Sequence, residues 1–391
     1  MTNFHADTGK PMTLWCTPHS LYSGKVRSYL IKKGLPFREF LPPHERFQQA
    51  VVPTLRHFVV PVLETTDGKF IQDSTIIIEE LERRFPERPM VPGTPVQRVL
   101  AHLLGGFGSE GLLSMAMHYR WSYRAEQEHF LRAEFGRAAH SGPDRDERLA
   151  AGSVLMDYFN DFLPNLGVNP NTTAAYEASF EELLEALDLH FQAYPYLLGG
   201  YPSIADFGFM AALFAHLSRD PIPSTLMKNR APNVYRWTER MNMALIADGE
   251  FPNQAAEWFP DDTIPETLEP VIALMFKDWG AQLLADAEFV NAWMKANPDL
   301  KAGHLASHDG ERKVHPVLGE VSYPWRGTTV TRGSMPHSLW HFERGASLAR
   351  ELEGDAKKRF EALVQRTNGS EVMQIKLARP IEREDDALVL G

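Results

Sequence analysis

The sequence predicts an α/β domain near its N-terminus, then an all-α domain, then a C-terminal extension. Short strand-like and helix-like patterns alternate over residues 12–88, an order that favours an α/β domain. Between residues 95 and 250 the strand signals end, and apolar residues recur at the helical spacings of three and four. The chain has 391 residues, more than an average domain, which favours two or three units.

The first domain begins with a short strand at residues 13–16 and a helix at 21–33, which Gly34 ends. A strand at residues 36–41 and a less regular helical segment at 44–54 follow. Because strands alternate with helices here, the early strands are expected to pair in parallel. The hairpin that follows is expected to add an antiparallel edge.

That hairpin lies in residues 59–78, the most informative stretch of the chain. Its β-branched run contains Pro61, which cannot donate to a sheet ladder and so marks a strand start or bend. A cis bond before the proline is one way to make such a bend. The Asp-Gly pair at 67–68 indicates a tight turn. The Asp-Ser pair at 73–74, ahead of three isoleucines, is typical of a capped helix start.

A proline-rich segment at residues 85–95 predicts the domain boundary. The helices expected after it span residues 96–118, 125–139, 144–162, 174–193, 204–217 and 231–245. The helix at 204–217 is apolar almost all round, which predicts a buried position. Ser203 and Asp206 before it form a capping-box arrangement. The first of these helices is rich in glycine, at Gly105, Gly106, Gly108 and Gly111.

The extension gives weaker signals. Helices are expected at residues 267–285, 289–296 and 344–365, and a strand at 372–378. Residues 303–340 show few helical signals, and residues 382–386 read as a solvated acidic run.

Composition excludes several classes of protein. The net charge of -11 argues against a nucleic-acid partner. The single cysteine, Cys16, rules out an internal disulfide and a cysteine zinc site, and it is expected to pack as a small hydrophobe. The first dozen residues lack the apolar core of a signal peptide. No run approaches the roughly 18 apolar residues of a membrane helix, so we expect a cytoplasmic protein with no membrane partner.

The motifs at Pro61, at 73–74 and at Ser203–Asp206 together resemble the glutathione transferase superfamily, over roughly residues 12–245. The resemblance implies the glutathione transferase fold: an α/β thioredoxin-like domain at 12–88, an all-α substrate domain at 95–250, and an extra segment at 251–391. It also implies glutathione as cosubstrate, a small hydrophobic second substrate and a homodimer.

The helix start at residue 21 is the candidate catalytic position. A hydroxyl there lies in the field of unpaired backbone N–H groups, which stabilise an anion such as a thiolate. In serine-type members of the superfamily the catalytic serine stands seven residues before the arginine of a Val-Arg pair. Counting back from Arg27 leads to Ser20, and Ser23 is the alternative. Helix capping is the structural interpretation of both serines.

The resemblance also assigns the residues that hold glutathione. A bend at Pro61 leaves the backbone N–H and C=O of Val60 unpaired in the sheet, free to meet an extended peptide; the superfamily uses this position for the cysteinyl backbone. The γ-glutamyl end falls to the pair at 73–74. There a carboxylate meets the ammonium, while a hydroxyl and helix amides meet the carboxylate. The residues concerned are Gln72, Asp73 and Ser74.

Other side chains are candidates for the substrate pocket, namely His19, Tyr22, Tyr119 and Trp121. No metal site is expected: His337 and His341 stand four apart, but no acidic or cysteinyl residue near them completes one. The extension is expected to fold over the cleft between the domains and narrow substrate choice.

The function that the resemblance implies is transfer of the glutathione thiolate to a hydrophobic, aromatic electrophile, with ether-cleaving, lyase or isomerase variants. The alternative is a transferase-like binding or scaffold protein without turnover, because a fold does not determine a function.

Overall fold

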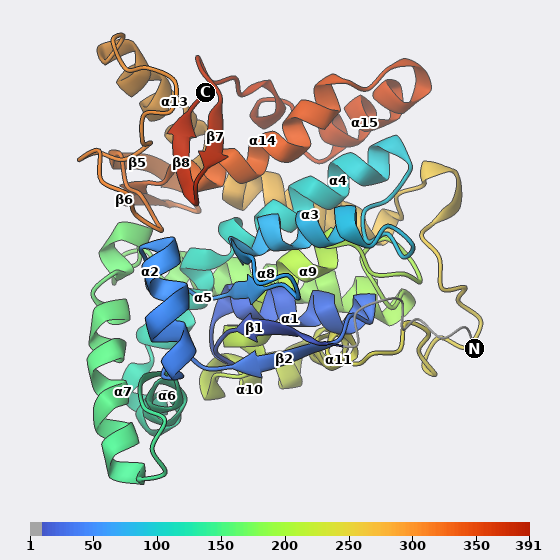
Figure 1. The fold of residues 1–391 in the computed structure, drawn as a ribbon. Helices are drawn as coiled ribbons and strands as arrows, with labels where there is room; N and C mark the ends of the chain where they lie inside the picture. The colour runs from blue at the N-terminus through green and yellow to red at the C-terminus, as the bar shows by residue number, and fades with distance from the viewer. Residues whose placement is uncertain (1–9) are drawn as a thin grey trace.

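A computed structural model describes residues 10–391 of the chain, and the α/β domain is as expected (Figure 1). Its sheet has the order β2-β1-β3-β4. Strands β1 and β2 are parallel, whereas β1–β3 and β3–β4 are antiparallel. The elements are β1 (Met12–Trp15), α1 (Leu21–Lys33), β2 (Phe37–Phe40), α2 (Val52–Leu55), β3 (Val62–Glu64), β4 (Phe70–Gln72) and α3 (Ser74–Arg84). The stretch used above to assess a signal peptide lies mostly outside the described residues.

Local signals set the ends of these elements. Ser20 caps α1, and Gly34 ends it in the left-handed conformation at φ 74°. The Val60–Pro61 peptide bond is cis. Gly68 turns the β3–β4 hairpin at φ 82°, and its amide donates to the carbonyl of Thr65 at 2.9 Å.

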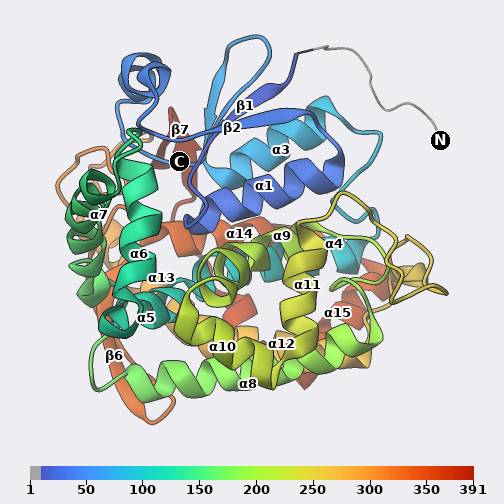
Figure 2. The same cartoon turned by 90° about the horizontal axis from the view of Figure 1, so that it is seen from below.

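The second domain is all helical, and Figure 2 shows the α/β domain on one side of the molecule and α8, α10 and α11 on the other. A π-helical turn, Phe107–Gly111, joins α4 to α5. Helix α10 was not expected from the sequence; its N1 proline starts it, but few apolar residues mark it. The helices are α4 (Pro95–Gly106), α5 (Leu113–Trp121), α6 (Arg124–Ala139), α7 (Arg145–Asn160), α8 (Thr173–Ala193), α9 (Ile204–Ala212), α10 (Pro221–Arg230) and α11 (Pro232–Met241).

Helix α9 lies in the core and starts with the predicted capping box. The hydroxyl of Ser203 accepts from the Ala205 amide at 3.3 Å. The carboxylate of Asp206 accepts from the Ser203 amide at 2.9 Å and from the Leu197 amide at 3.0 Å. Two buried loop amides thereby gain partners that the helix itself does not supply.

Ser203→Ala is expected to lower the free energy of unfolding by about 0.5–2 kcal/mol, since the Ala205 amide would lose its acceptor. Urea titration followed by circular dichroism measures the change. The control is Ser141→Ala, an exposed serine outside the helices, which should leave the midpoint unchanged. Equal midpoints for both variants would contradict the capping role.

One described helical stretch, Pro95–Trp121, is long and apolar enough to cross a membrane by length and composition. This corrects the expectation that no run approaches that length: the helix continues through its glycines and the π turn. Inside the protein 83% of its most apolar window is buried, as in the core helix of a folded domain.

The extension differs from the sequence-based expectation in several places. The helix expected at 344–365 is two helices, broken where Gly354 takes φ 55°. The strand expected at 372–378 is a short 3-10 turn, Val372–Gln374. The run at 382–386 is mostly exposed, as expected, and it also forms part of the β7–β8 hairpin. The elements are α12 (Glu269–Leu274), α13 (Gly280–Ala296), β5 (Gly319–Trp325), β6 (Thr328–Ser334), α14 (Pro336–Arg350), α15 (Gly354–Arg366), β7 (Ile381–Glu384) and β8 (Ala387–Leu390).

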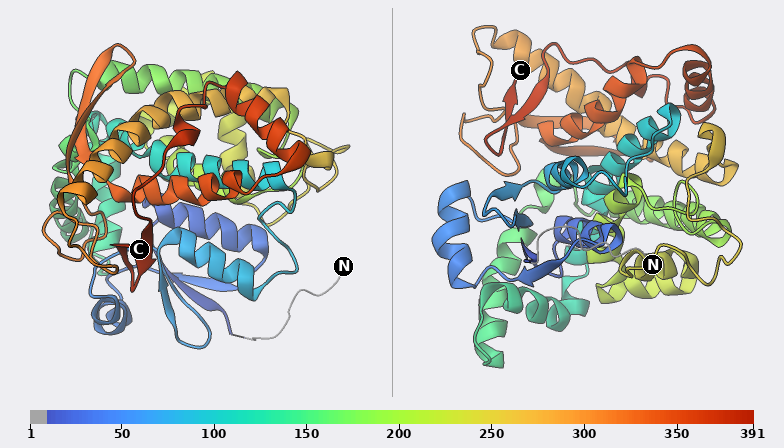
Figure 3. Two further views of the ribbon diagram at one scale, coloured as in Figure 1. Left: turned by 90° about the horizontal axis from the view of Figure 1, so that it is seen from above. Right: turned by 45° about the vertical axis from the view of Figure 1, so that its right-hand side comes forward.

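The extension packs on one face of the molecule, and α14 lies alongside α4 (Figure 3). It also reaches the α/β domain, where Arg344 pairs with Glu79 of α3 and Arg383 of β7 donates to Gln72 of β4. The C-terminal segment therefore covers the start of α3, where the sequence predicts part of the ligand site.

Candidate functional site

Three segments with predicted site residues leave the sheet at the same edge. In the β1–β3 ladder Trp15 stands opposite Val62, and in the β3–β4 ladder Val62 stands opposite Gln72. The chain after β1, the chain before β3 and the chain after β4 therefore meet there. The sequence predicted these residues separately, and the register of the strands places them close together.

Ser20 lies at the start of α1 with extended backbone and a half-buried side chain. Its Oγ accepts from the Ser23 amide at 3.4 Å, so it occupies the end of the helix where amides are unpaired. Ser23 is fully buried, and its Oγ accepts from the Thr17 amide at 3.4 Å. This geometry favours Ser20 over Ser23 for contact with a ligand.

Cys16 is fully buried at the end of β1. Burial raises the pKa of its thiol to about 12, although Arg27 donates to Sγ at 3.5 Å. The thiol is therefore protonated near neutral pH and is no nucleophile, in agreement with a packing role.

The backbone of Val60 is unpaired, as the bend at Pro61 predicts. Among residues 10–391, neither its N–H nor its C=O has a backbone hydrogen-bond partner. Its side chain is half-buried. A peptide in extended conformation would find both groups available at this edge of the sheet.

Asp73 caps α3 in an unusual backbone conformation, φ 65° and ψ 142°. Such strain in a residue other than glycine gathers at functional sites. Its Oδ1 accepts from the Thr75 amide at 2.7 Å. Burial alone would raise the pKa of this carboxyl. Nearby His337 first, and then Arg383, His341 and Lys25, outweigh burial and hold the pKa below its usual range.

The extension closes this end of the site. The exposed fractions are 8% for Gln72, 7% for Asp73 and 4% for Ser74. His337 of α14 places Nε2 3.5 Å from Oδ2 of Asp73, and Arg383 donates to the side-chain oxygen of Gln72. A ligand at this end would meet groups from both the first domain and the extension.

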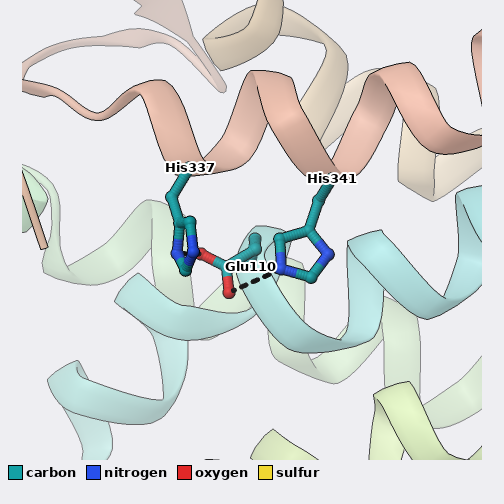
Figure 4. A group of neighbouring side chains, drawn as sticks. All are labelled: Glu110, His337 and His341. Carbon is teal, nitrogen blue, oxygen red and sulfur yellow. Dashed lines mark ion pairs between the residues drawn. The ribbon is translucent and has the colours of Figure 1, made fainter. Parts of the chain in front are cut away.

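Figure 4 shows a second group of side chains, Glu110 below α14 with His337 and His341 pointing toward it. Tyr22 joins them by donating its hydroxyl to Oε1 of Glu110 at 2.9 Å. Burial raises the pKa of Glu110 to about 7. The expectation of no metal site rested on the lack of a nearby acid. In the structure that reason fails, because Glu110 lies beside both histidines. The sequence showed only the i, i+4 histidine pair, since Glu110 is remote from it along the chain.

Three of the substrate-pocket candidates lie in the core instead. The ring of His19 lies 4.2 Å from that of Phe135, and Trp121 packs on the same phenylalanine at 5.5 Å. Tyr119 packs on Phe180 at 4.9 Å. Of the four candidates, the half-buried Tyr22 is the one that reaches the charged group around Glu110.

The mixed four-stranded sheet and the all-α domain after it define a protein with a thioredoxin-like first domain and a helical second domain, to which the extension is added. Residues 14–89 match the family described as "Glutathione S-transferase, N-terminal domain". Residues 154–243 match the one described as "Glutathione S-transferase, C-terminal domain". The chain belongs to the glutathione S-transferase superfamily and continues well beyond these two domains.

A curated relative, the stringent starvation protein A homolog of Histophilus somni, is 30% identical over 93 residues. The match covers 24% of this chain and 43% of that protein, less than half of the relative's length.

Solved structures of low similarity cover between 60% and 66% of the chain. A glutathione S-transferase from Methylobacterium radiotolerans, in complex with glutathione sulfonate, is 21% identical, with 66% of this chain and 99% of that chain covered and a TM-score of 0.35. The beta-etherase LigF from Sphingobium sp. strain SYK-6 is 21% identical, with 60% and 95% covered and a TM-score of 0.37. FzlA from C. crescentus is 20% identical, with 66% and 97% covered and a TM-score of 0.35.

Proposed function

We propose that this protein binds glutathione and directs its thiolate to a small hydrophobic electrophile. The observation that carries the proposal is the meeting of the Ser20 helix start, the unpaired backbone of Val60 and the strained cap Asp73 at one edge of the sheet. A hydroxyl, an extended-peptide site and a carboxylate are the groups that the three parts of glutathione require.

In this proposal the cysteinyl part of glutathione pairs with the N–H and C=O of Val60. The ammonium group of the γ-glutamyl part meets Asp73, and the carboxylate of the same part meets Ser74 and the first amides of α3. The hydroxyl of Ser20 donates to the sulfur, which favours the thiolate and lowers the thiol pKa. The thiolate then forms a bond to the electrophilic carbon as the leaving group departs with its electron pair.

The binding site would include the extension. The ammonium group of glutathione would meet Asp73 next to His337, and Arg383, which donates to Gln72, lies near the same end of the site. Aromatic ethers and isomerisable substrates belong to the same proposal, because the same thiolate attacks each of them.

Ser20→Ala is expected to lower the rate of glutathione transfer by about a hundredfold, the cost of losing one donor to a developing anion. Calorimetry should show that glutathione affinity changes much less, because the tripeptide is held elsewhere. Ser203→Ala is the matched control: it removes another helix-capping serine, far from the proposed ligand, and should keep its activity per folded molecule. Equal rates for wild type and Ser20→Ala would exclude Ser20 as the catalytic group.

A non-catalytic binding or scaffold role is the second candidate, and one observation favours it. The end of the site around Asp73 and Ser74 is covered by the extension. If millimolar glutathione produces neither binding heat nor a thermal shift, this second candidate is supported and the transferase proposal fails.

The proposal also includes a homodimer, as the family resemblance implies, and a cytoplasmic location. Light scattering after size exclusion tests the dimer, which should have twice the 44.3 kDa chain mass. A mass equal to one chain at micromolar concentration would contradict it.

A further inference from the structure

Two histidines of α14 and one glutamate of the turn after α4 meet inside the protein (Figure 4). His341 Nε2 lies 3.7 Å from Glu110 Oε1, and His337 Nδ1 lies 3.9 Å from Glu110 Oε2. One ligand atom from each residue lies within 4.8 Å of the other two. All three side chains are more than nine-tenths buried.

These separations are close to those of a formed metal site. Nitrogen and oxygen ligands lie about 2.0–2.2 Å from a zinc ion, which places two tetrahedral ligands about 3.4 Å apart. The two carboxylate–imidazole distances exceed this value by only a few tenths of an ångström, and no two of the three ligand atoms are more than 4.8 Å apart. The three side chains therefore already lie within reach of one ion.

The groups around the three residues are those that commonly surround metal ligands. With Nδ1 of His337 on the ion, its Nε2–H would point to Oδ2 of Asp73, now 3.5 Å away. A histidine ligand typically donates its second ring N–H to a carboxylate in this way. The hydroxyl of Tyr22 orients Glu110 by donating to Oε1 at 2.9 Å.

The imidazole of His337 lacks hydrogen-bond partners. Only 5% of the residue is exposed, yet within residues 10–391 neither of its ring nitrogens makes a hydrogen bond. An unpaired buried polar group costs free energy and calls for an explanation.

The charges around the three residues are compatible with a bound cation. Two carboxylates are present, Glu110 within the group and Asp73 next to His337. Lys25 opposes a bound cation, but its Nζ points to another partner and donates to Thr75 Oγ1 at 2.8 Å. The arginines that approach from the extension have partners of their own, Glu79 for Arg344 and Gln72 for Arg383.

We propose that Glu110, His337 and His341 bind one divalent first-row metal ion of the Zn²⁺ type. Two imidazoles and one carboxylate are a ligand set of zinc sites that keep an open position. His341, together with Lys25 and Gly106, lines a cavity of about 260 Å³, so a water or a small ligand has space beside this histidine. The ion would join α14 of the extension to the helical domain.

Zn²⁺ binding to the untagged full-length protein, stripped with chelator and free of glutathione, tests the proposal. Calorimetry and elemental analysis should give one Zn²⁺ per chain, and Co²⁺ should give the visible absorption of a site with nitrogen and oxygen ligands. His341→Gln and Glu110→Gln should each weaken binding by more than about a hundredfold. Tyr22→Phe, which removes an outer partner, should weaken it by about 10–100-fold.

His102→Gln is the matched control, because His102 lines the same cavity but lies outside the ligand group. It should bind Zn²⁺ like wild type, and circular dichroism should show every variant folded. The proposal is overturned if folded wild type binds less than one tenth of an equivalent, or if His341→Gln and Glu110→Gln bind as tightly as His102→Gln. Because glutathione is absent, the result is independent of the proposed transferase function.

Discussion

Arg120→Met is expected to lower the free energy of unfolding by about 3–5 kcal/mol, the usual cost of removing one partner of a buried ion pair. The guanidinium meets Asp220 with Nε 2.6 Å from Oδ2 and Nη2 2.8 Å from Oδ1. Both residues are buried, and burial raises the pKa of Asp220 even beside its partner. Without Arg120 the buried carboxylate would lose the guanidinium that contacts both of its oxygens.

The same substitution should reach the candidate site. Nη1 of Arg120 donates to the carbonyl of His19 at 2.8 Å, and His19 directly precedes Ser20. Arg120, which belongs to the helical domain, thus holds in place the loop that carries the hydroxyl of Ser20. Hydrogen exchange of the Ser20 amide should be faster in the folded variant.

Urea titration with linear extrapolation measures the stability change. Arg230→Met is the matched control, since Arg230 pairs with Glu181 at 3.0 Å on the surface and should cost less than about 1 kcal/mol. Adding Asp220→Asn to Arg120→Met should recover part of the loss. Similar small effects for the buried and the exposed arginine would contradict this account.

Gly108→Ala is expected to destabilise the protein by about 1–3 kcal/mol or more, the cost of inserting a group into a packed core. Gly108 lies in the turn between α4 and α5, where a Cβ would stand 2.4 Å from the Phe209 amide nitrogen and 2.6 Å from the Gly208 carbonyl carbon. These are backbone atoms of α9, which cannot rotate away. In a solvent-exposed helix the same change would stabilise the protein by about 1 kcal/mol. A destabilising effect would therefore indicate that the turn and α9 are in close contact.

Gly93→Ala is the control, because no atom lies within 4 Å of a Cβ added there. Thermal unfolding should show a lower midpoint for Gly108→Ala and little change for Gly93→Ala. A Gly108→Ala variant as stable as wild type would mean that the turn Phe107–Gly111 and α9 are not in backbone contact at this point.

Much of the first domain was predictable because its signals are local. The bounds of α1, Leu21–Lys33, are those expected from the sequence, since a capping serine and a terminal glycine act within one helical turn. The bend at Pro61 and the cap at Asp73 are equally local. The expectation for 344–365 was wrong because amphipathic periodicity continues across Gly354, although the backbone does not.

The sequence by itself determined the kind of fold and the chemistry of each segment: a hydroxyl at the α1 start, an unpaired backbone at Val60 and a carboxylate at Asp73. Only the tertiary structure decided which residues are buried and which remote residues lie close together. It buried Tyr119 and Trp121, and it brought Glu110 to the histidines of α14. The reason is physical. Caps and bends depend on dihedral angles and neighbours a few residues away, whereas a contact between remote segments depends on how the whole core packs.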